Sequence, residues 1–339
     1  MATQNSSISF KDLLSPPDFK KHWFVTGGAG FIGSFVVDLL MAAGLNVTVY
    51  DNLSLSTDQW LKPYFGQDNF KFIKGDLLDA PLLEKSMAGH QIVWHLGANT
   101  DIPSGYTKHK IDLDNDVLAT FNVLEAMLKN KIKEMLFAST GALYGESIKG
   151  LFSESSGPLL PLSLYGAGKL ACEAFISAYS NLFGIKAWMF RFGNVIGGRM
   201  THGIIFDFIK KLKQDPTQLE VLNDGKTMKN YFLVEDCIHG ILSVYQKVKN
   251  PLTLLNLGTD STSTVGSIAQ IIIEEMNLKN VRINFVPRKR GWPGDQPVVL
   301  LDTAKVHKLG WYAHYASDEA VRMATRRMLG KDNFVMKYR

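Results

Sequence analysis

The chain has 339 residues, of which 46% are hydrophobic and 20% are charged, and its formal net charge is +5. This composition is ordinary for a soluble globular protein, with enough apolar material for one large domain or two smaller ones. The charge is mild and is nowhere gathered into a dense Lys/Arg run, which argues against a nucleic-acid partner, and no stretch of about 18 apolar residues could span a membrane.

From residue 23 onward, short apolar runs alternate with helical patterns. The runs predicted to be strands are WFVT (23–26), NVTVYD (46–51), FKFIKGD (70–76), IVWHLG (92–97), EMLFAST (134–140) and KAWMFRFGN (186–194). Apolar side chains at helical spacing predict helices at 31–43, about 112–130 and 164–182. This alternation predicts an α/β fold, with a parallel sheet covered by helices on both faces.

The regular alternation ends near residue 195. The elements predicted beyond it are a helix near 203–213, a turn at 223–226, a strand that runs into a helix at YFLVEDCIHGILSVYQ (231–246), a strand at 254–258 and a helix at 265–277. We therefore predict a sheet domain over 21–194, onto which 230–258 folds back, and a smaller α+β substrate lobe made of 195–229 and 259–339. Residues 1–20 are predicted to be an N-terminal tail or a short appended helix.

A glycine-rich turn joins the first predicted strand to the first predicted helix. TGGAGFIG (26–33) contains the pattern Gly-x-x-Gly-x-x-Gly, which allows a tight turn, close backbone approach to a pyrophosphate and close packing of helix on strand. The helix N-terminus supplies N–H donors to the phosphates. We therefore predict a Rossmann-type, doubly wound parallel sheet that binds a dinucleotide. The positions assigned to the cofactor in this turn are Gly27, Gly30, Phe31, Ile32 and Gly33.

Asp51 ends the second predicted strand, 18 residues past Gly33. A carboxylate at this place accepts hydrogen bonds from both ribose hydroxyls of an adenosine. It also repels a 2′-phosphate, and the following Asn52, Leu53 and Ser54 include no arginine to hold one. The sequence therefore predicts NAD and not NADP, with Asp51 and Asn52 in the cofactor site.

Tyr165 and Lys169 are four residues apart in YGAGK, which places them on one face of the helix predicted at 164–182. An ammonium beside a phenol is expected to lower the pKa of the phenol and make the tyrosine a usable base near neutral pH.

Cys172 on the same helix is interpreted as a small core residue. The two cysteines form no CxxC, and the eight histidines show no metal-ligand spacing, so we predict reduced thiols and no metal site.

Over about residues 22–312 the chain resembles the extended short-chain dehydrogenase/reductase family, within it the NAD-dependent nucleotide-sugar epimerases and dehydratases, and most of all enzymes of the UDP-glucose 4-epimerase type. The stretches that carry the resemblance are TGGAGFIG, YDNLS (50–54), GDLLD (75–79), HLGA (95–98), STGALYG (139–145), YGAGK (165–169), RFGNVIGGR (191–199), DGKTMKNYFLVED (224–236) and RGWPGD (290–295).

The resemblance implies further cofactor contacts. Asp76 and Leu77 would flank the adenine, and Leu96 and Ala98 would line the path of the pyrophosphate and ribose. Lys169, besides assisting Tyr165, would bind the nicotinamide ribose. Phe192 would lie near the nicotinamide, and Tyr165 is counted with the cofactor contacts as well.

The resemblance also implies a substrate side. Asn194 would bind a phosphate or sugar oxygen, and Arg290 would hold the diphosphate as a bidentate cation, with Asp295 in the same motif. Two departures from the family pattern matter here. Lys229 and Asn230 replace the usual Arg-Asp pair, so Lys229 keeps the charge without the guanidinium fork. NDV replaces the usual Asn-Val before the helix predicted at 112–130, which leaves Asn115 or Asp116 as the possible contact.

The family's catalytic Ser/Thr position is Thr140, and the two residues after it indicate the reaction. Dehydratases of this family carry an Asp-Glu pair after the threonine, whereas this chain has Gly141 and Ala142, which neither donate nor accept a proton. The trio of Thr140, Tyr165 and Lys169 supports epimerisation at C4 of a UDP-hexose or UDP-N-acetylhexosamine. In that reaction C4 is transiently oxidised, and hydride returns to its other face. Val299 is expected to leave room for an acetamido group.

Other interpretations remain open. The chain could catalyse 2- or 3,5-epimerisation, dehydration or net reduction of a nucleotide sugar, with His202 or Cys237 as an extra acid or base, or it could be a catalytically idle NAD-binding regulatory protein. The family resemblance implies a homodimer in which helices near 112–130 and 164–182 pair. The first residues lack a secretory signal, which predicts a cytoplasmic protein.

Overall fold

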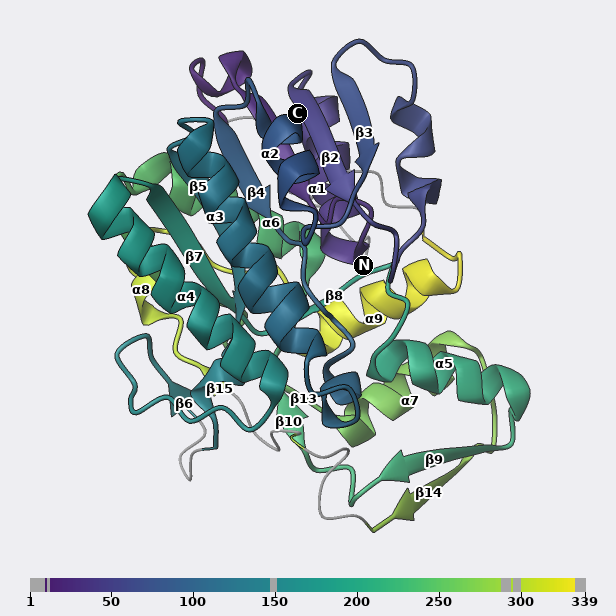
Figure 1. Cartoon of the computed structure of the whole chain (residues 1–339). Helices are drawn as coiled ribbons and strands as arrows, with labels where there is room; N and C mark the ends of the chain where they lie inside the picture. The colour runs from purple at the N-terminus through teal and green to yellow at the C-terminus, as the bar shows by residue number, and fades with distance from the viewer. Residues whose placement is uncertain (1–9, 11–12, 147–150, 288–293, 295–299, 333–339) are drawn as a thin grey trace.

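The computed structural model describes residues 10, 13–146, 151–287, 294 and 300–332. At its centre lies a seven-stranded parallel sheet in the order β12-β7-β5-β4-β1-β2-β3 (Figure 1). Its strands are β1 (His22–Thr26), β2 (Asn46–Asp51), β3 (Phe70–Lys74), β4 (Ile92–His95), β5 (Glu134–Thr140), β7 (Lys186–Phe192) and β12 (Leu252–Leu257). The predicted α/β, doubly wound parallel sheet is confirmed.

The strand order places the site. The chain enters at β1, runs outward through β2 and β3, and then returns to add β4 on the other side of β1. The strand order therefore reverses between β1 and β4. In doubly wound sheets, the crevice at the carboxyl ends of the strands beside such a reversal is where dinucleotides bind.

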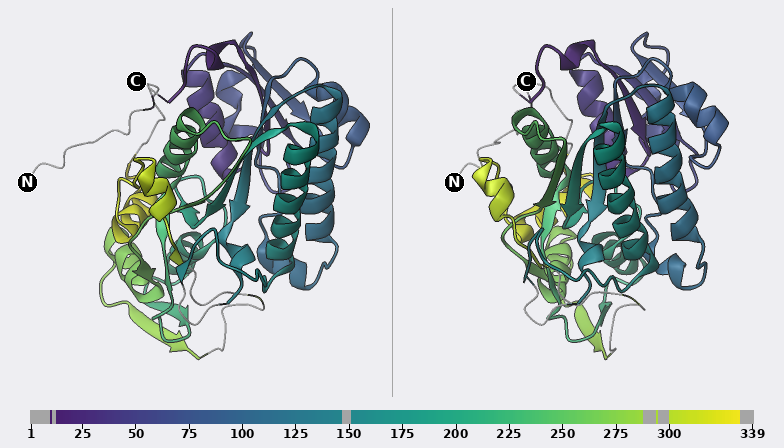
Figure 2. Two further views of the ribbon diagram at one scale, coloured as in Figure 1. Left: turned by 90° about the vertical axis from the view of Figure 1, so that its left-hand side faces the viewer. Right: turned by 60° about the vertical axis from the view of Figure 1, so that its left-hand side comes forward.

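Helices cover both faces of the sheet, and strand alternation gives each face its own core (Figures 1 and 2). Trp23 and Val25 of β1 point into the core formed with α1 (Phe31–Ala42) and α6 (Val234–Lys247). Phe24 points into the opposite core, formed with α2 (Ala80–Met87), α3 (Ala119–Lys129) and α4 (Leu164–Phe183). Successive side chains of a strand alternate between faces, so near-continuous apolar runs are expected in a strand buried on both sides.

A smaller lobe follows β7 and lies at the lower right of Figure 1. Its core is closed by α5 (Ile204–Gln214), α7 (Val265–Glu275) and α9 (Ser317–Met328). Two-stranded pairings surround these helices or link the lobe to the sheet domain: β8 (Asn194–Ile196) with β11 (Tyr231–Leu233), β9 (Gln218–Leu222) with β14 (Arg282–Val286), β10 (Met228–Lys229) with β13 (Ser263–Thr264), and β6 (Leu151–Phe152) with β15 (Leu300–Leu301). The short helix α8 (Ala304–Lys308) precedes α9.

Some elements differ from the sequence predictions. The helix predicted at about 112–130 is a π-helix over Leu113–Leu118 that continues as α3. Helices α2, α8 and α9 were not predicted, nor were strands β9 and β14. Within 230–258, β12 pairs with β7 and α6 packs into the core of the sheet.

The described part of residues 1–20 is anchored to the sheet domain. Phe10 is fully buried and lies edge-on to His239 of α6, with ring centroids 5.8 Å apart. Asp18 accepts hydrogen bonds from Tyr245 (2.7 Å) and Gln246 (2.6 Å) of the same helix. None of the helices in the described ranges has the length and apolar character that a membrane crossing requires.

Candidate active site

The glycine turn after β1 leaves no room for side chains. Gly27 has a φ of +68°, which favours glycine, and a Cβ there would lie 2.7 Å from the backbone nitrogen of Gly97. A Cβ on Gly33 would meet the Gly27 carbonyl oxygen and lie 2.7 Å from Gly28 Cα. Helix α1 begins directly after Gly30, and no side chain caps its N-terminus. The turn thus offers the close backbone approach and the N–H donors that the pyrophosphate of NAD needs.

Asp51 holds this turn in place. Its carboxylate accepts hydrogen bonds from the Ala29 N–H (3.0 Å) and the Leu53 N–H (2.8 Å). Burial raises the pKa of Asp51, against the lowering effect of those N–H donors. A carboxylate at the end of β2 and beside the turn fits the predicted role of binding the adenosine ribose: Oδ1 also accepts from the Ser56 hydroxyl (3.3 Å), while Oδ2 has a second lone pair to offer.

The predicted adenine contacts lie next to Asp51. Asn52 donates a hydrogen bond from Nδ2 to the Asp76 carboxylate (2.9 Å). The Leu77 side chain lies against Gly97, where a Cβ would be 2.7 Å from Leu77 Cδ1. Leu96 donates its N–H to Thr26 Oγ1 (3.2 Å), so the turn after β4 is tied to the end of β1. The carboxyl ends of β1 to β4 therefore bring the predicted cofactor residues to one edge.

The three predicted catalytic side chains meet at the ends of β5 and α4. Thr140 is the last residue of β5, and its hydroxyl accepts a hydrogen bond from the Ala142 N–H (3.1 Å) and lies near enough to the Tyr165 phenol to lower its pKa. Lys169 Nζ lies 5.9 Å from the centre of the Tyr165 ring and donates to the Ala138 carbonyl oxygen (3.1 Å). Helix α4 begins with its N-cap Ser163 accepting from the Gly166 N–H (3.1 Å), which fixes the first turn that carries Tyr165.

The ionisation of Tyr165 differs from the sequence expectation of a lowered phenol pKa. Burial and the nearby Asp116 carboxylate raise the pKa of Tyr165 well above its ordinary value, while the hydrogen bond from Thr140 acts in the opposite direction. The expectation counted only the ammonium of Lys169, whose hydrogen bond is directed to Ala138. Burial and a nearby carboxylate make a phenol harder to ionise, and here the two outweigh the effect expected from a lysine at i+4.

The two candidate contact residues in NDV, Asn115 and Asp116, have different surroundings. Asp116 is 1% exposed, and it acts electrostatically on both Tyr165 and Lys169. Asn115 donates its side-chain amide to the Ile111 carbonyl oxygen (2.9 Å), which is a contact within its own helical turn. Burial, partly opposed by Lys169, raises the pKa of Asp116 to about 7. Asp116 therefore lies next to the predicted catalytic side chains Tyr165 and Lys169, whereas Asn115 does not.

Sequence reasoning missed two members of the cluster around Asp116. Asn99 donates from Nδ2 to Asp112 (2.8 Å) and from its backbone N–H to Asp116 (3.2 Å). Asp112 is 1% exposed, four residues before Asp116. Asp112 could have been found from its i, i+4 spacing to Asp116 at the start of a predicted amphipathic helix, since that spacing places both carboxyls on one face.

We expect Asp116→Asn to stabilise the protein more at alkaline than at acidic pH. Because the folded-state pKa of Asp116 is raised to about 7, the wild type loses stability as the pH rises from the unfolded-state pKa toward that value, and asparagine does not titrate. The difference in the free energy of unfolding between variant and wild type should grow by about 2 kcal/mol from pH 5 to pH 8 in urea titrations. A difference that is the same at both pH values would mean that Asp116 is already charged at pH 5.

On the predicted substrate side, Asn194 and Lys229 lie on neighbouring segments. Asn194 in β8 is paired with Tyr231 of β11, and its Nδ2 donates to the Asn230 carbonyl oxygen (3.1 Å). Lys229 is half-buried in β10, opposite Ser263 of β13. Phe192 ends β7 and is 8% exposed. The predicted contacts Arg290, Asp295 and Val299 lie outside the described residues, and the roles of all these residues stay predictions.

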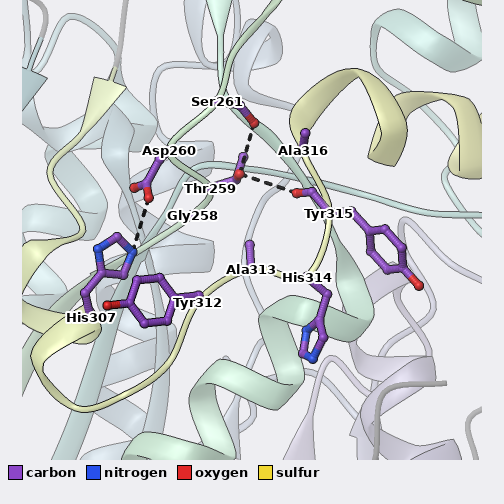
Figure 3. Close-up of a pocket in the computed structure, with 10 residues that line it drawn as sticks. All are labelled: Gly258, Thr259, Asp260, Ser261, His307, Tyr312, Ala313, His314, Tyr315 and Ala316. Atoms are coloured by element: carbon purple, nitrogen blue, oxygen red, sulfur yellow. Dashed lines mark hydrogen bonds and ion pairs between the residues drawn. The ribbon is translucent and has the colours of Figure 1, made fainter. Parts of the chain in front are cut away.

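A small hollow of about 210 Å³ opens beside the end of β12 (Figure 3). Its polar groups pair with one another. Asp260 lies 3.5 Å from His307, and Thr259 Oγ1 lies within hydrogen-bond distance of Ser261 Oγ (3.1 Å). His307 also stacks on Tyr312, with ring centroids 4.2 Å apart. None of the trio Thr140, Tyr165 and Lys169 lines this hollow, and we interpret it as a junction between the sheet and the lobe.

Comparison with known proteins agrees with this geometry. A model of the NAD dependent epimerase/dehydratase family matches residues 23–258. The chain is 31% identical over 304 residues to a putative UDP-glucose 4-epimerase of Methanocaldococcus jannaschii, with 88% of this chain and 95% of that protein covered. Its relatives also include dTDP-D-glucose 4,6-dehydratases, such as that of Bos taurus at 27% identity, over 88% of this chain and 86% of the relative.

Solved structures give the same result. A UDP-galactose 4-epimerase superimposes with a TM-score of 0.79 and 33% identity, covering 91% of this chain and 99% of its own. The UDP-glucose 4-epimerase of Thermus thermophilus, in complex with NAD, superimposes with a TM-score of 0.81 and 27% identity over the same shares. The prediction of NAD as cofactor, made from the glycine turn and Asp51, is confirmed. The family match and the shared fold show that the chain belongs to the NAD-dependent epimerase/dehydratase family.

Proposed function

We propose that the protein is an isomerase that inverts C4 of a UDP-linked hexose or N-acetylhexosamine. The observation that carries this proposal is the chemistry around Thr140. Thr140 lies beside the Tyr165 phenol, and the next two residues, Gly141 and Ala142, which begin a short 3-10 turn (Gly141–Tyr144), carry neither an acid nor a base. The 4-epimerases among the relatives support the same reaction.

In the proposed reaction the chain's own residues move one proton. Tyr165, as phenolate, accepts the proton of the sugar 4-hydroxyl, and Thr140 orients the same oxygen through its own hydroxyl. Lys169, which is buried and donates to the Ala138 carbonyl oxygen, lies beside the phenol, with its Nζ 5.9 Å from the ring centre. Bound NAD would supply the hydride chemistry at C4 that this proton transfer accompanies. Tyr165 then gives the proton back to the C4 oxygen, so the net redox change is zero.

Dehydration and 3,5-epimerisation need a further acid or base at the sugar. Cys237 of α6 is fully buried in the apolar core, where burial raises the pKa of its thiol well above the ordinary value. His202 is exposed in the turn before α5. Asp112 and Asp116 are each 1% exposed. None of these four side chains replaces the Asp-Glu pair that the resembled dehydratases carry.

The test of the proposed function is turnover of a panel of nucleotide sugars, followed by proton NMR of the anomeric signals. We expect interconversion of a UDP-sugar with its C4 epimer, without added NADH and without net reduction. Release of a 4-keto-6-deoxy sugar would instead identify a dehydratase, and bound NAD without turnover of any nucleotide sugar would favour the idle regulatory protein.

Thr140→Val is expected to reduce turnover by about ten- to a hundredfold, a smaller loss than removal of the Tyr165 hydroxyl. The substitution removes one hydrogen bond to the phenol and to the reacting oxygen but leaves the proton acceptor in place, and a hydrogen bond to a charged group contributes about 1.5–3 kcal/mol. Steady-state kinetics of the two variants side by side provide the measurement. A Thr140→Val loss as large as that of Tyr165→Phe would mean that Thr140 itself transfers the proton.

We also propose a homodimer in which α3, α4 and the preceding π-helix pair with those of a second copy. Several large apolar side chains of these helices are exposed, which is the pattern of a surface that another chain covers. They are Leu113, Leu118, Leu164, Phe175, Leu182 and Phe183.

A cytoplasmic location stays a proposal, supported by the two buried free thiols of Cys172 and Cys237.

A further inference from the structure

A carboxyl group with a free oxygen is buried between the π-helix and α4. Asp116 Oδ1 accepts the Asn99 N–H at 3.2 Å, whereas Asp116 Oδ2 has no hydrogen-bond partner in the part of the chain that the structure describes. That oxygen faces α4, because a Cβ on Gly168 would lie 3.3 Å from it. Gly168 directly precedes Lys169. The missing Cβ therefore lets the Asp116 carboxyl approach the helix that carries both Tyr165 and Lys169.

When Asp116 and Tyr165 are both ionised, the cluster contains two negative charges and only the one positive charge of Lys169. Lys169 is the cation that acts on Asp116, and its own hydrogen bond is directed to Ala138. Lys169 also acts on His95: burial together with Lys169 lowers the pKa of that imidazole to about 3, so it stays neutral. A carboxylate and a phenolate would then share one ammonium in a buried space, and each would disfavour ionisation of the other.

The titratable and polar groups that surround Asp116 come from three sides. Cys172 of α4 donates its thiol to the Asp116 carbonyl oxygen (3.3 Å) and is itself kept neutral, because burial raises the pKa of its thiol to about 11. Asp112 lies one turn earlier and faces Gly105. The full set is Tyr165, Lys169 and Cys172 from α4, Asp112 from the start of the π-helix and Asn99 from the loop after β4.

We propose that Asp116 is a positioning residue that controls the ionisation of Tyr165: the neutral carboxyl permits the phenolate, and the carboxylate suppresses it. This inference rests on the proposed role of Tyr165 as the base. The raised pKa of Asp116, about 7, places its change of charge in the neutral range, where the base must form. The acidic limb of the rate–pH profile therefore reports the coupled Asp116–Tyr165 pair and not the phenol alone.

The test is a titration of the Tyr165 phenol in the NAD-loaded protein, followed by the near-ultraviolet absorbance of tyrosinate. Because the chain has 11 tyrosines, the same titration of Tyr165→Phe is subtracted to isolate this phenol. Asp116→Asn keeps the size and polarity of the side chain and removes its charge. We expect the phenol of Asp116→Asn to ionise at a pH lower by about one unit or more than in the wild type. The acidic limb of kcat/KM should move in the same direction.

Asp112→Asn is the matched control. It makes the same chemical change at an equally buried aspartate that also hydrogen bonds Asn99. Asp112, however, faces Gly105, and its carboxylate raises the pKa of Tyr165 less than that of Asp116 does. A clearly smaller shift is expected. If Asp116→Asn does not fold, Asp116→Ser removes the charge with a smaller side chain and should lower the ionisation pH likewise.

An unchanged or higher ionisation pH in the Asp116 variant, or an equal shift in Asp112→Asn, would overturn the proposal. The absorbance titration needs no substrate, so it measures the phenol even if no nucleotide sugar is turned over. Failure of the turnover assay with a shifted phenol would overturn the proposed function and leave the electrostatic role of Asp116 standing.

Discussion

Tyr165→Phe is expected to lower turnover by about 10²–10⁴-fold, the range for loss of a general acid–base group. The substitution removes only the phenolic oxygen, which is the proton acceptor in the proposed reaction. The ring remains to pack at the start of α4, so the effect should fall on kcat with little change in KM. Steady-state kinetics with the preferred nucleotide sugar, and retained NAD as a check on folding, provide the measurement.

Tyr179→Phe on the same helix is the matched control. Tyr179 donates a hydrogen bond to Glu125 of α3 (2.6 Å) and is 8% exposed, so its removal perturbs helix packing without touching the cluster of Thr140, Tyr165 and Lys169. We expect a modest loss of stability and nearly full activity. Comparable losses of turnover in both variants would show that the Tyr165 effect is one of packing and not of proton transfer.

Gly33→Ala is expected to abolish retention of NAD. The added Cβ would meet the Gly27 carbonyl oxygen and lie 2.7 Å from Gly28 Cα, and both are backbone atoms that cannot turn aside. The glycine turn must shift, at a cost on the order of 3 kcal/mol or more, which corresponds to about a hundredfold weaker binding. The measurement is the amount of NAD released on denaturation per mole of soluble protein.

Gly266→Ala provides the comparison for this variant. Gly266 lies in the first turn of α7, and a Cβ there would lie 3.4 Å from the Gly225 carbonyl oxygen, an ordinary contact. NAD content should equal that of the wild type. Full NAD content in Gly33→Ala would contradict the assignment of this turn as the pyrophosphate site.

The sheet could be predicted from sequence because its strands are buried on both faces. In such a sheet each strand is a short apolar run, and the helices between show clear 3.6-residue spacing, so β1, β2, β4, β5 and β7 were placed within a few residues. The glycine turn could be predicted equally well, because a Cβ at Gly27 or Gly33 would collide with backbone atoms and only glycine fits there.

What could not be predicted depends on three-dimensional neighbours. Helix α9 buries one regular stripe, but its members are small or polar, so the stripe was weak in the sequence; they are Ser317, Ala320, Val321, Ala324 and Thr325. Phe10 is buried by α6, an element more than 200 residues further along the chain. The raised pKa of Tyr165 was missed because it depends on burial and on Asp116, and both arise only when the π-helix packs against α4.

In the proposed reaction, no acid or base other than Tyr165 acts on the sugar ring. Running the reaction in heavy water tests it most directly, because an enzyme without such a group cannot enolise the keto intermediate at C3 or C5. We expect NMR and mass spectra of the product to show inversion at C4 and no deuterium on any ring carbon. Deuterium at C3 or C5 would contradict the account, since it would reveal a second base and a 3,5-epimerase or dehydratase chemistry.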